Sequence, residues 1–235
     1  MGRGQVVRQR FLVPSIEGSN PSDPANALML KRSSDRFCYY NGMKQLIIAF
    51  DMDGVLVDHT STVLEYLASK GIIAEAHEAI FSNLPNILDE DALKNLFDQM
   101  YETPEGTLNS KLMPGAIEAV KAIRNEGCKV YLLSRRNDIA IPRTMLERLG
   151  LWPMYFDHTN TFFAERSFRK PEIAADLGIT HYVDDQPSAL VGLMKGVANK
   201  YLFDQYNCMP DDSSYVRIES WAEFTAQLLG SDNMH

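Results

Sequence analysis

The sequence predicts an α/β fold: a doubly wound, Rossmann-like parallel sheet of five strands, with a small helical cap inserted after strand 1. From Lys44 onward, short apolar runs alternate with segments of helical periodicity, which is typical of a parallel sheet covered on both faces. Residues 58–112 interrupt this alternation with helical patterns alone. A chain of 235 residues is long enough to bury one sizeable core and carry an insertion.

Five apolar runs are expected to form the sheet. The first, at residues 45–50, is continuous and therefore typical of a strand buried on both faces. The other expected strands are residues 129–133, 154–156, 180–183 and 198–203. Helical spacing of apolar residues predicts helices that begin at Pro114 and Pro142, and further helices at 172–177, 188–195 and 221–229.

This pattern divides the chain into three parts. Residues 1–42 are expected to be a disordered extension; because they contain arginines and few acids, a transit peptide is the second interpretation. Met43 precedes the first strand and is a candidate alternative start. Residues 43–57 and 113–235 are expected to form the core. The cap, residues 58–112, has candidate helices at 62–69, 72–81 and 91–101 and holds no convincing strand.

Composition excludes several classes of protein. The net charge is −8, and the cap segment carries ten acidic and three basic residues, so we expect no nucleic acid polymer or anionic membrane as partner. No apolar run approaches the roughly 18 residues of a membrane-spanning helix. Cys38, Cys128 and Cys208 are scattered, which favours reduced thiols in a cytoplasmic protein.

Polar residues follow several of the expected strands, at the edge where doubly wound sheets bind ligands. Each residue alone is ordinary in a turn or a helix cap, but their joint occurrence on one sheet indicates a site. The candidate residues are Asp51 and Asp53, Ser134 and Arg135, Lys170, and the adjacent acids Asp184 and Asp185.

Four converging carboxylates require a counter-charge. Two like charges 4 Å apart repel by about 4 kcal/mol at an effective dielectric of 20, and one lysine does not offset several such pairs. A hard divalent cation does, and oxygen ligands favour Mg²⁺. The same cation neutralises a phosphate that approaches a carboxylate nucleophile, and carboxylates can accept a phosphoryl group.

The strand ends resemble those of the haloacid dehalogenase superfamily of Asp-dependent phosphohydrolases over about residues 44–205. The resemblance implies a Mg²⁺-dependent phosphomonoesterase acting on a small phosphorylated substrate. Asp51 would be the nucleophile that becomes phosphorylated. Asp53 would protonate the leaving alcohol, then activate water, and its backbone carbonyl would contact the metal.

The same resemblance implies roles for the other candidates. The Ser134 hydroxyl would bind the phosphoryl group together with Lys170, for which Arg169 is the alternative cation, and Arg135 is a further phosphate-binding candidate. Asp185 would ligate Mg²⁺ directly. The full predicted metal set is Asp51, Asp53, Asp184 and Asp185, with Asp184 bound directly or through water.

Within the superfamily, the run from Asp51 to Asp58 is most similar to the 5′(3′)-deoxyribonucleotidase-like branch, which implies a nucleoside monophosphate as substrate. Leu133-Ser134-Arg135 departs from the Thr-Ser-Pro of that branch. The cap aromatics are interpreted as the core of the lid more readily than as a base-stacking surface: Tyr66, Phe81, Phe97 and Tyr101. His59 and His77 are expected at the surface.

Two alternatives stay open at this point. A phosphomutase or phosphotransferase would use the same residues with an acceptor alcohol in place of water. A phospho-accepting receiver domain also gathers acids, a hydroxyl and a lysine, but it has paired acids after its first strand and no lid. Here the Asp-x-Asp-Gly motif comes first and the acid pair comes last.

Overall fold

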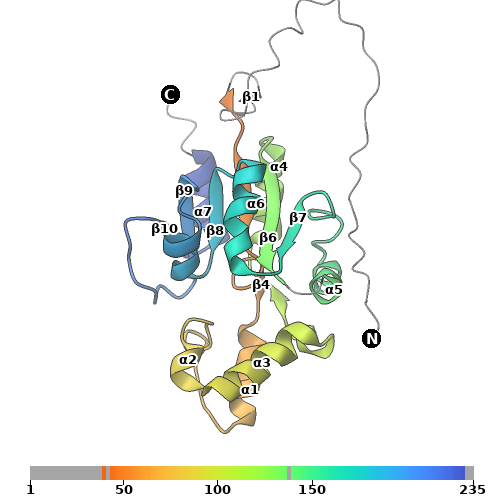
Figure 1. Ribbon diagram of the computed structural model, residues 1–235, viewed down its shortest axis with the longest axis vertical. Coiled ribbons are helices and arrows are strands. Elements are labelled where there is room, and N and C mark those ends of the chain that lie inside the picture. Colours follow the sequence, from red (N-terminus) through yellow and green to blue (C-terminus); the bar gives the residue numbers. More distant parts are fainter. Residues whose placement is uncertain (1–38, 41–42, 137–138, 231–235) are drawn as a thin grey trace, which may run out of the picture. The chain divides into compact units, whose positions relative to one another are not determined.

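The computed structural model describes residues 39–40, 43–136 and 139–230 (Figure 1). The expectations for residues 1–38 and 41–42 therefore lie outside the described residues. Within the described part, β1 (Tyr39–Tyr40) pairs antiparallel with β2 (Met43–Lys44), just before the sheet begins. No helix in these described ranges has the length and apolar character needed to cross a membrane.

The predicted doubly wound α/β fold is confirmed, with six parallel strands in the order β10-β9-β8-β3-β6-β7. The central strand β3 is buried along its whole length, as its uninterrupted apolar sequence predicts. The strands are β3 (Ile47–Phe50), β6 (Lys129–Arg135), β7 (Thr161–Ala164), β8 (His181–Asp184), β9 (Asn199–Phe203) and β10 (Val216–Ile218).

One strand prediction was wrong, and one strand of the sheet was not predicted. Residues 154–156 do not form the third strand, because the amides of Tyr155 and Phe156 both donate to Leu151 O and close a turn that buries the Phe156 ring. The third strand is β7 instead, whose exposure is intermediate at three of four positions. The sixth strand, β10, is a three-residue edge strand with an exposed Val216, too short to give a periodic signal.

Helices cover both faces of the sheet (Figure 1). On one face, Ile48 and Phe50 of β3 pack with α4, α5 and α7; on the other, Ile47 and Ala49 pack with α6 and the 189–193 turn. The alternation of side chains along a strand produces this division. The helices are α4 (Ala116–Asn125), α5 (Ala140–Arg148), α6 (Lys170–Leu177) and α7 (Trp221–Gly230). The helix predicted at 188–195 is a single π-helical turn, Ala189–Leu193.

The cap follows the first strand of the sheet, as predicted, and has its own apolar core. The chain enters it through β4 (Val57–Asp58) and leaves through β5 (Lys111–Leu112), which pair antiparallel, although no strand was expected in this segment. Its helices are α1 (Thr60–Ser69), α2 (Leu84–Ile87) and α3 (Glu90–Glu102). Their buried side chains include Val63, Leu67, Leu84, Leu96 and Met100.

The prediction of a helix at 72–81 was wrong: residues 72–75 have no regular structure, and residues 76–81 form turns and bends. Gly71 has a φ of 76°, which ends α1 in a left-handed conformation. Ile73 is fully exposed, so the apolar residues that followed helical spacing do not share a buried face. The Glu78 carboxylate accepts from the Glu75 amide and stabilises one of the turns.

Candidate active site

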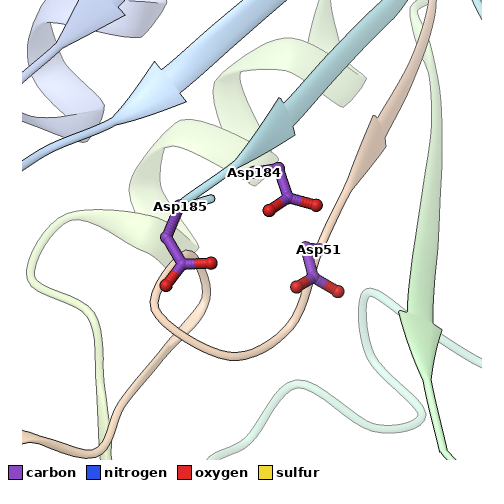
Figure 2. A group of neighbouring side chains, drawn as sticks. All are labelled: Asp51, Asp184 and Asp185. Atoms are coloured by element: carbon purple, nitrogen blue, oxygen red, sulfur yellow. The ribbon is translucent and has the colours of Figure 1, made fainter. Parts of the chain in front are cut away.

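The carboxyl ends of the neighbouring strands β8 and β3 bring three aspartates together (Figure 2). Asp51 follows β3, Asp184 is the last residue of β8, and Asp185 comes directly after it. The Asp51 amide donates to Val183 O at 2.9 Å, which fixes the end of β3 against β8. One carboxylate oxygen of each aspartate lies within 4.8 Å of the others. Side chains that are 133 residues apart in the sequence thus share one site.

This cluster fits a divalent cation. Asp185 Oδ1 is buried and has no hydrogen-bond partner among the described residues, which is costly unless another ligand satisfies it. Burial, with Asp184 and Asp51 close by, raises the pKa of Asp185 well above its usual range. A hard cation bound by these oxygens would supply the missing partner and remove the electrostatic penalty. The donor set, three carboxylates, is of the kind that Mg²⁺ prefers.

Gly54 allows Asp185 to approach the loop that follows Asp51. Its φ is 72°, a conformation that L side chains rarely adopt. A Cβ placed on Gly54 would overlap the Asp185 carboxylate. The motif therefore requires glycine at position 54 for two reasons: the turn has a positive φ, and the Asp185 carboxylate occupies the space that a side chain would take.

Lys170 is the cation of the cluster. It starts α6 and is 5% exposed, and its Nζ lies 3.1 Å from Asp51 Oδ1 and 3.4 Å from Asp184 Oδ2. Burial alone would lower the pKa of Lys170, but Asp51, Tyr182 and Asp184 raise it well above its usual value, so the ammonium is charged. Arg169, the alternative cation, instead forms an exposed pair with Glu172.

The Tyr182 hydroxyl bridges Lys170 and Asp184. It donates to Asp184 Oδ2 at 2.8 Å and accepts from Lys170 Nζ at 2.9 Å. Sequence reasoning did not select this residue, because a tyrosine inside an apolar strand is ordinary core. Its position two residues before Asp184 was the available signal, since alternate residues of a strand lie on the same face.

The environments of the two aspartates in the Asp-x-Asp motif differ sharply. Burial, with Asp184 and Asp53 close by, raises the pKa of Asp51 to about 6 although Lys170 opposes the shift. Burial would also raise the pKa of Asp53, but the Arg136 guanidinium and His59 hold it well below its usual range. Asp53 Oδ1 lies 2.6 Å from His59 Nε2, and its other oxygen is paired with Arg136. The Asp53 side chain thus stands outside the three-carboxylate cluster.

The prediction that His59 is at the surface was wrong. His59 is only 3% exposed, and its Nδ1 lies 2.7 Å from the Ser110 hydroxyl. Since His59 follows β4 and Ser110 precedes β5, both crossings between cap and core contribute to the support of Asp53. The available signal was the position of His59 directly after the Asp51–Asp58 motif. His77 is exposed, as expected.

The two polar residues at the end of β6 differ in exposure. Ser134 is 1% exposed, whereas Arg135 is exposed. Arg136, which was not selected from the sequence, contacts Asp53, and its guanidinium lies 4.2 Å from the centre of the Tyr101 ring in the cap. Arg136, and not the predicted Arg135, is therefore the arginine that contacts the Asp53 carboxylate. The side-chain alternation of a strand is the reason.

The cap aromatics pack mainly against one another. The Phe97 and Tyr101 rings are stacked at 5.7 Å, and the edge of Phe81 meets both of these rings. The His59 ring joins this group at 5.8 Å from Phe81. The cluster thus forms part of the cap core and ends at His59, beside Asp53.

Comparisons with known proteins agree with this geometry. The sequence profile of haloacid dehalogenase-like hydrolases matches residues 46–177, more than half of the chain. A protein of Oceanobacillus iheyensis named "Putative nucleotidase" is 29% identical over 162 residues, which cover 66% of this chain and 78% of that protein.

Solved structures show the same fold. A haloacid dehalogenase family hydrolase from Deinococcus radiodurans, solved with phosphate and sodium, superimposes with a TM-score of 0.53 at 17% identity, over 80% of this chain and 96% of that one. A haloacid dehalogenase-like protein from Agrobacterium tumefaciens gives a TM-score of 0.54 at 18% identity, over 80% and 99% of the two chains. Together with the profile match, the fold and the strand-end residues lead to one conclusion: the chain belongs to the haloacid dehalogenase-like hydrolase family.

Proposed function

We propose that this hydrolase is a Mg²⁺-dependent phosphomonoesterase that uses Asp51 as its nucleophile. The observation that carries the proposal is that Asp51 lies 3.1 Å from Lys170 and shares one cluster with the carboxylates of Asp184 and Asp185. A carboxylate in this position faces both a fixed ammonium group and a set of oxygens suited to a cation. With a divalent cation bound, such a site would attract a phosphate dianion that the aspartates alone would repel.

The first chemical step is phosphoryl transfer to the protein. An oxygen of Asp51 attacks phosphorus and the bond from phosphorus to the leaving oxygen breaks. A proton reaches that oxygen through Asp53, which is ionised in the free protein and takes up the proton from solvent when the phosphate dianion binds beside it. In the second step, Asp53 takes a proton from water as the water attacks the aspartyl-phosphate. The bond from phosphorus to Asp51 then breaks and inorganic phosphate leaves.

The other residues hold and neutralise the phosphoryl group. Mg²⁺ bound by Asp51, Asp184 and Asp185, together with the Asp53 carbonyl, would supply Lewis-acid stabilisation of the charge on the phosphoryl oxygens. Lys170 adds a fixed positive charge beside Asp51 and Asp184, and we assign to the buried Ser134 hydroxyl a hydrogen bond to a phosphoryl oxygen. His59 and Arg136 orient the Asp53 carboxylate.

Small phosphate monoesters are the proposed substrates, and nucleoside monophosphates are the first group to screen. Two findings support this choice: the similarity of the Asp51–Asp58 run to deoxyribonucleotidases, and the name of the Oceanobacillus relative. Membership in a hydrolase family favours water as the final acceptor over the phosphotransferase alternative, and it favours an enzyme over a receiver domain.

Phosphate release from p-nitrophenyl phosphate tests the proposal. We expect turnover with Mg²⁺, none after chelation, and none in Asp51→Asn. Asp98→Asn, which changes an exposed cap carboxylate paired with Lys94, is the matched control and should retain activity. Acid quenching during turnover should trap phosphate on the peptide that contains Asp51. Turnover by Asp51→Asn, or phosphate trapped on a peptide that lacks Asp51, would overturn the assignment.

A further inference from the structure

An open pocket adjoins the carboxylate cluster, because Gly54 and Asp185 belong to its lining. One wall comes from the cap, at residues 79–81. The opposite wall comes from the core, at residues 203–206 and Met209. A phosphate monoester with its phosphorus at Asp51 has this pocket available for its leaving group.

The core wall is a loop held in place by a buried carboxylate. Asp204, 3% exposed, accepts from the amides of Cys208 at 3.1 Å and Met209 at 2.8 Å. The Met209 sulfur accepts from the hydroxyl of Ser82 in the cap at 3.3 Å. The loop therefore has a defined shape, and it contacts the cap directly.

The lining is mostly apolar, and its charged members are all acidic. It includes Ile80 and Phe81 of the cap and Met113 and Phe203 of the core. Among the described residues that line the pocket there is no lysine or arginine, whereas three aspartates line it: Asp58, Asp185 and Asp204.

Basic groups in or near the pocket are already paired. His59, which belongs to the lining, is hydrogen-bonded with Asp53 and Ser110. Arg217, which is not among the lining residues, lies 3.5 Å from Asp204 and also binds Asp211 at 2.8 Å and the Asn207 side chain. Lys170 pairs with Asp51, and Arg136 with Asp53. A second anionic group on the substrate would therefore meet Asp58 and Asp204 without a free counter-charge, in a partly desolvated space where repulsion is strong.

We propose that this pocket selects phosphate monoesters whose leaving group is uncharged and presents an apolar face to Phe81 and Met209. The inference rests on the proposed function and narrows its substrate class. It excludes good turnover of bisphosphates and of phosphate esters of hydroxy acids. An anionic leaving group is disfavoured because the pocket offers it no counter-charge and places like charges near it. Such repulsion lets a site reject a competitor of similar size.

Two aryl phosphates of nearly equal size separate charge from shape. In 4-carbamoylphenyl phosphate the distal group is neutral, and in 4-carboxyphenyl phosphate it is an anion. With Mg²⁺, we expect kcat/KM at least tenfold lower for the carboxylate, with the difference reduced at high salt because screening weakens the repulsion. Equal kcat/KM values for the two compounds would overturn this inference but not the proposed function. Failure to hydrolyse either compound would overturn the proposed function and the inference with it.

A charge introduced into the core wall provides the second test. Gln205 lines the pocket, so Gln205→Lys should raise the carboxylate-to-carbamoyl ratio of kcat/KM at least threefold. Gln205→Met, which removes the amide without adding charge, is the matched control and should leave the ratio near that of the wild type. A ratio that is the same in the two variants would show that this wall does not contact the leaving group.

Discussion

The His59 imidazole lies 2.6 Å from Asp53 and 2.7 Å from Ser110, and so connects the predicted acid–base carboxylate to both chain crossings of the cap. A hydrogen bond from a buried imidazole fixes which way a carboxylate faces. His59 does not need to touch the substrate to matter for turnover. We propose that His59 acts as a positioning residue, through Asp53.

His59→Phe should lower kcat by tenfold or more with a smaller change in KM. The phenyl ring keeps the contacts with Phe81 and Tyr101 but cannot hydrogen-bond to Asp53, so part of the roughly 10² to 10⁴ gained by acid–base catalysis is lost. The pH profile of kcat should shift, which a purely structural change would not cause. His77→Phe, at an exposed position, is the control. An unchanged kcat and pH profile would remove His59 from this role.

Gly54→Ala should weaken Mg²⁺ activation, because its Cβ would displace the Asp185 carboxylate. Gly71→Ala is a matched control: its φ of 76° is close to the 72° of Gly54, but nothing lies within 4 Å of the added Cβ. Both variants should lose about 1 kcal/mol or more of stability from the left-handed conformation. Titration of activity with Mg²⁺ should show a higher half-saturating concentration in Gly54→Ala only.

Lys170→Met should reduce kcat/KM by about 10²-fold or more, since a fixed charge beside the phosphoryl group is lost. It should also destabilise the metal-free protein, because Asp51 and Asp184 would keep their burial without their cation. Arg169→Met removes a neighbouring cation whose pair with Glu172 is exposed, so it should change neither quantity much. Equal losses in the two variants would refute the distinction between these cations.

The metal-free protein should lose thermal stability as the pH rises from 4 to 7. Burial raises the pKa of Asp51 to about 6 and that of Asp185 well above its usual range, so the folded state favours their protonated forms. Below pH 4 both folded and unfolded states bind these protons and the penalty vanishes; as the pH rises, the unfolded chain releases them first. For Asp51 alone the penalty is about 3 kcal/mol.

Melting curves across this pH range, with and without Mg²⁺, check this expectation. Mg²⁺ should restore the melting temperature at pH 7, because it binds the folded state. Asp185→Asn should flatten the pH dependence of the metal-free protein. Asp53 contributes in the opposite direction: its pKa is lowered, so its stabilisation is present above pH 4 and is lost only at lower pH. A metal-free melting temperature that stays constant from pH 4 to 7 would contradict this account.

Sequence patterns predicted the parts of the fold that rest on periodicity and strand ends. The apolar run before Asp51 forms the central strand, and Asp51 lies with the paired acids at 184 and 185 at the carboxyl end of the sheet, as predicted. Residues 154–156 were wrongly predicted to be a strand and the edge strand β10 was missed, because three-residue segments carry no periodic signal. Turn hydrogen bonds, such as those to Leu151 O, decide such segments, and they depend on tertiary contacts.

The candidate site was predictable where residues are near in sequence and less so where packing selects among neighbours. The choice of Lys170 over Arg169, and of Arg136 over Arg135, depends on which side chain the local helix or strand directs inward. His59 was missed for the same reason, since its partner Ser110 is 51 residues away. The roles of these residues in catalysis stay predictions until the variants above are measured.

The antiparallel pair of β4 and β5 brings together the two points at which the chain enters and leaves the cap, so the cap can be exchanged as a unit. The helical segment between these strands has its own apolar interior, while the sheet that carries Asp51 and Asp184 is completed by residues outside it. A cap from another protein, grafted between Asp58 and Lys111, should therefore leave the catalytic residues of the sheet in place and change which substrates are accepted. The graft must also replace the hydrogen bond between Ser110 and His59.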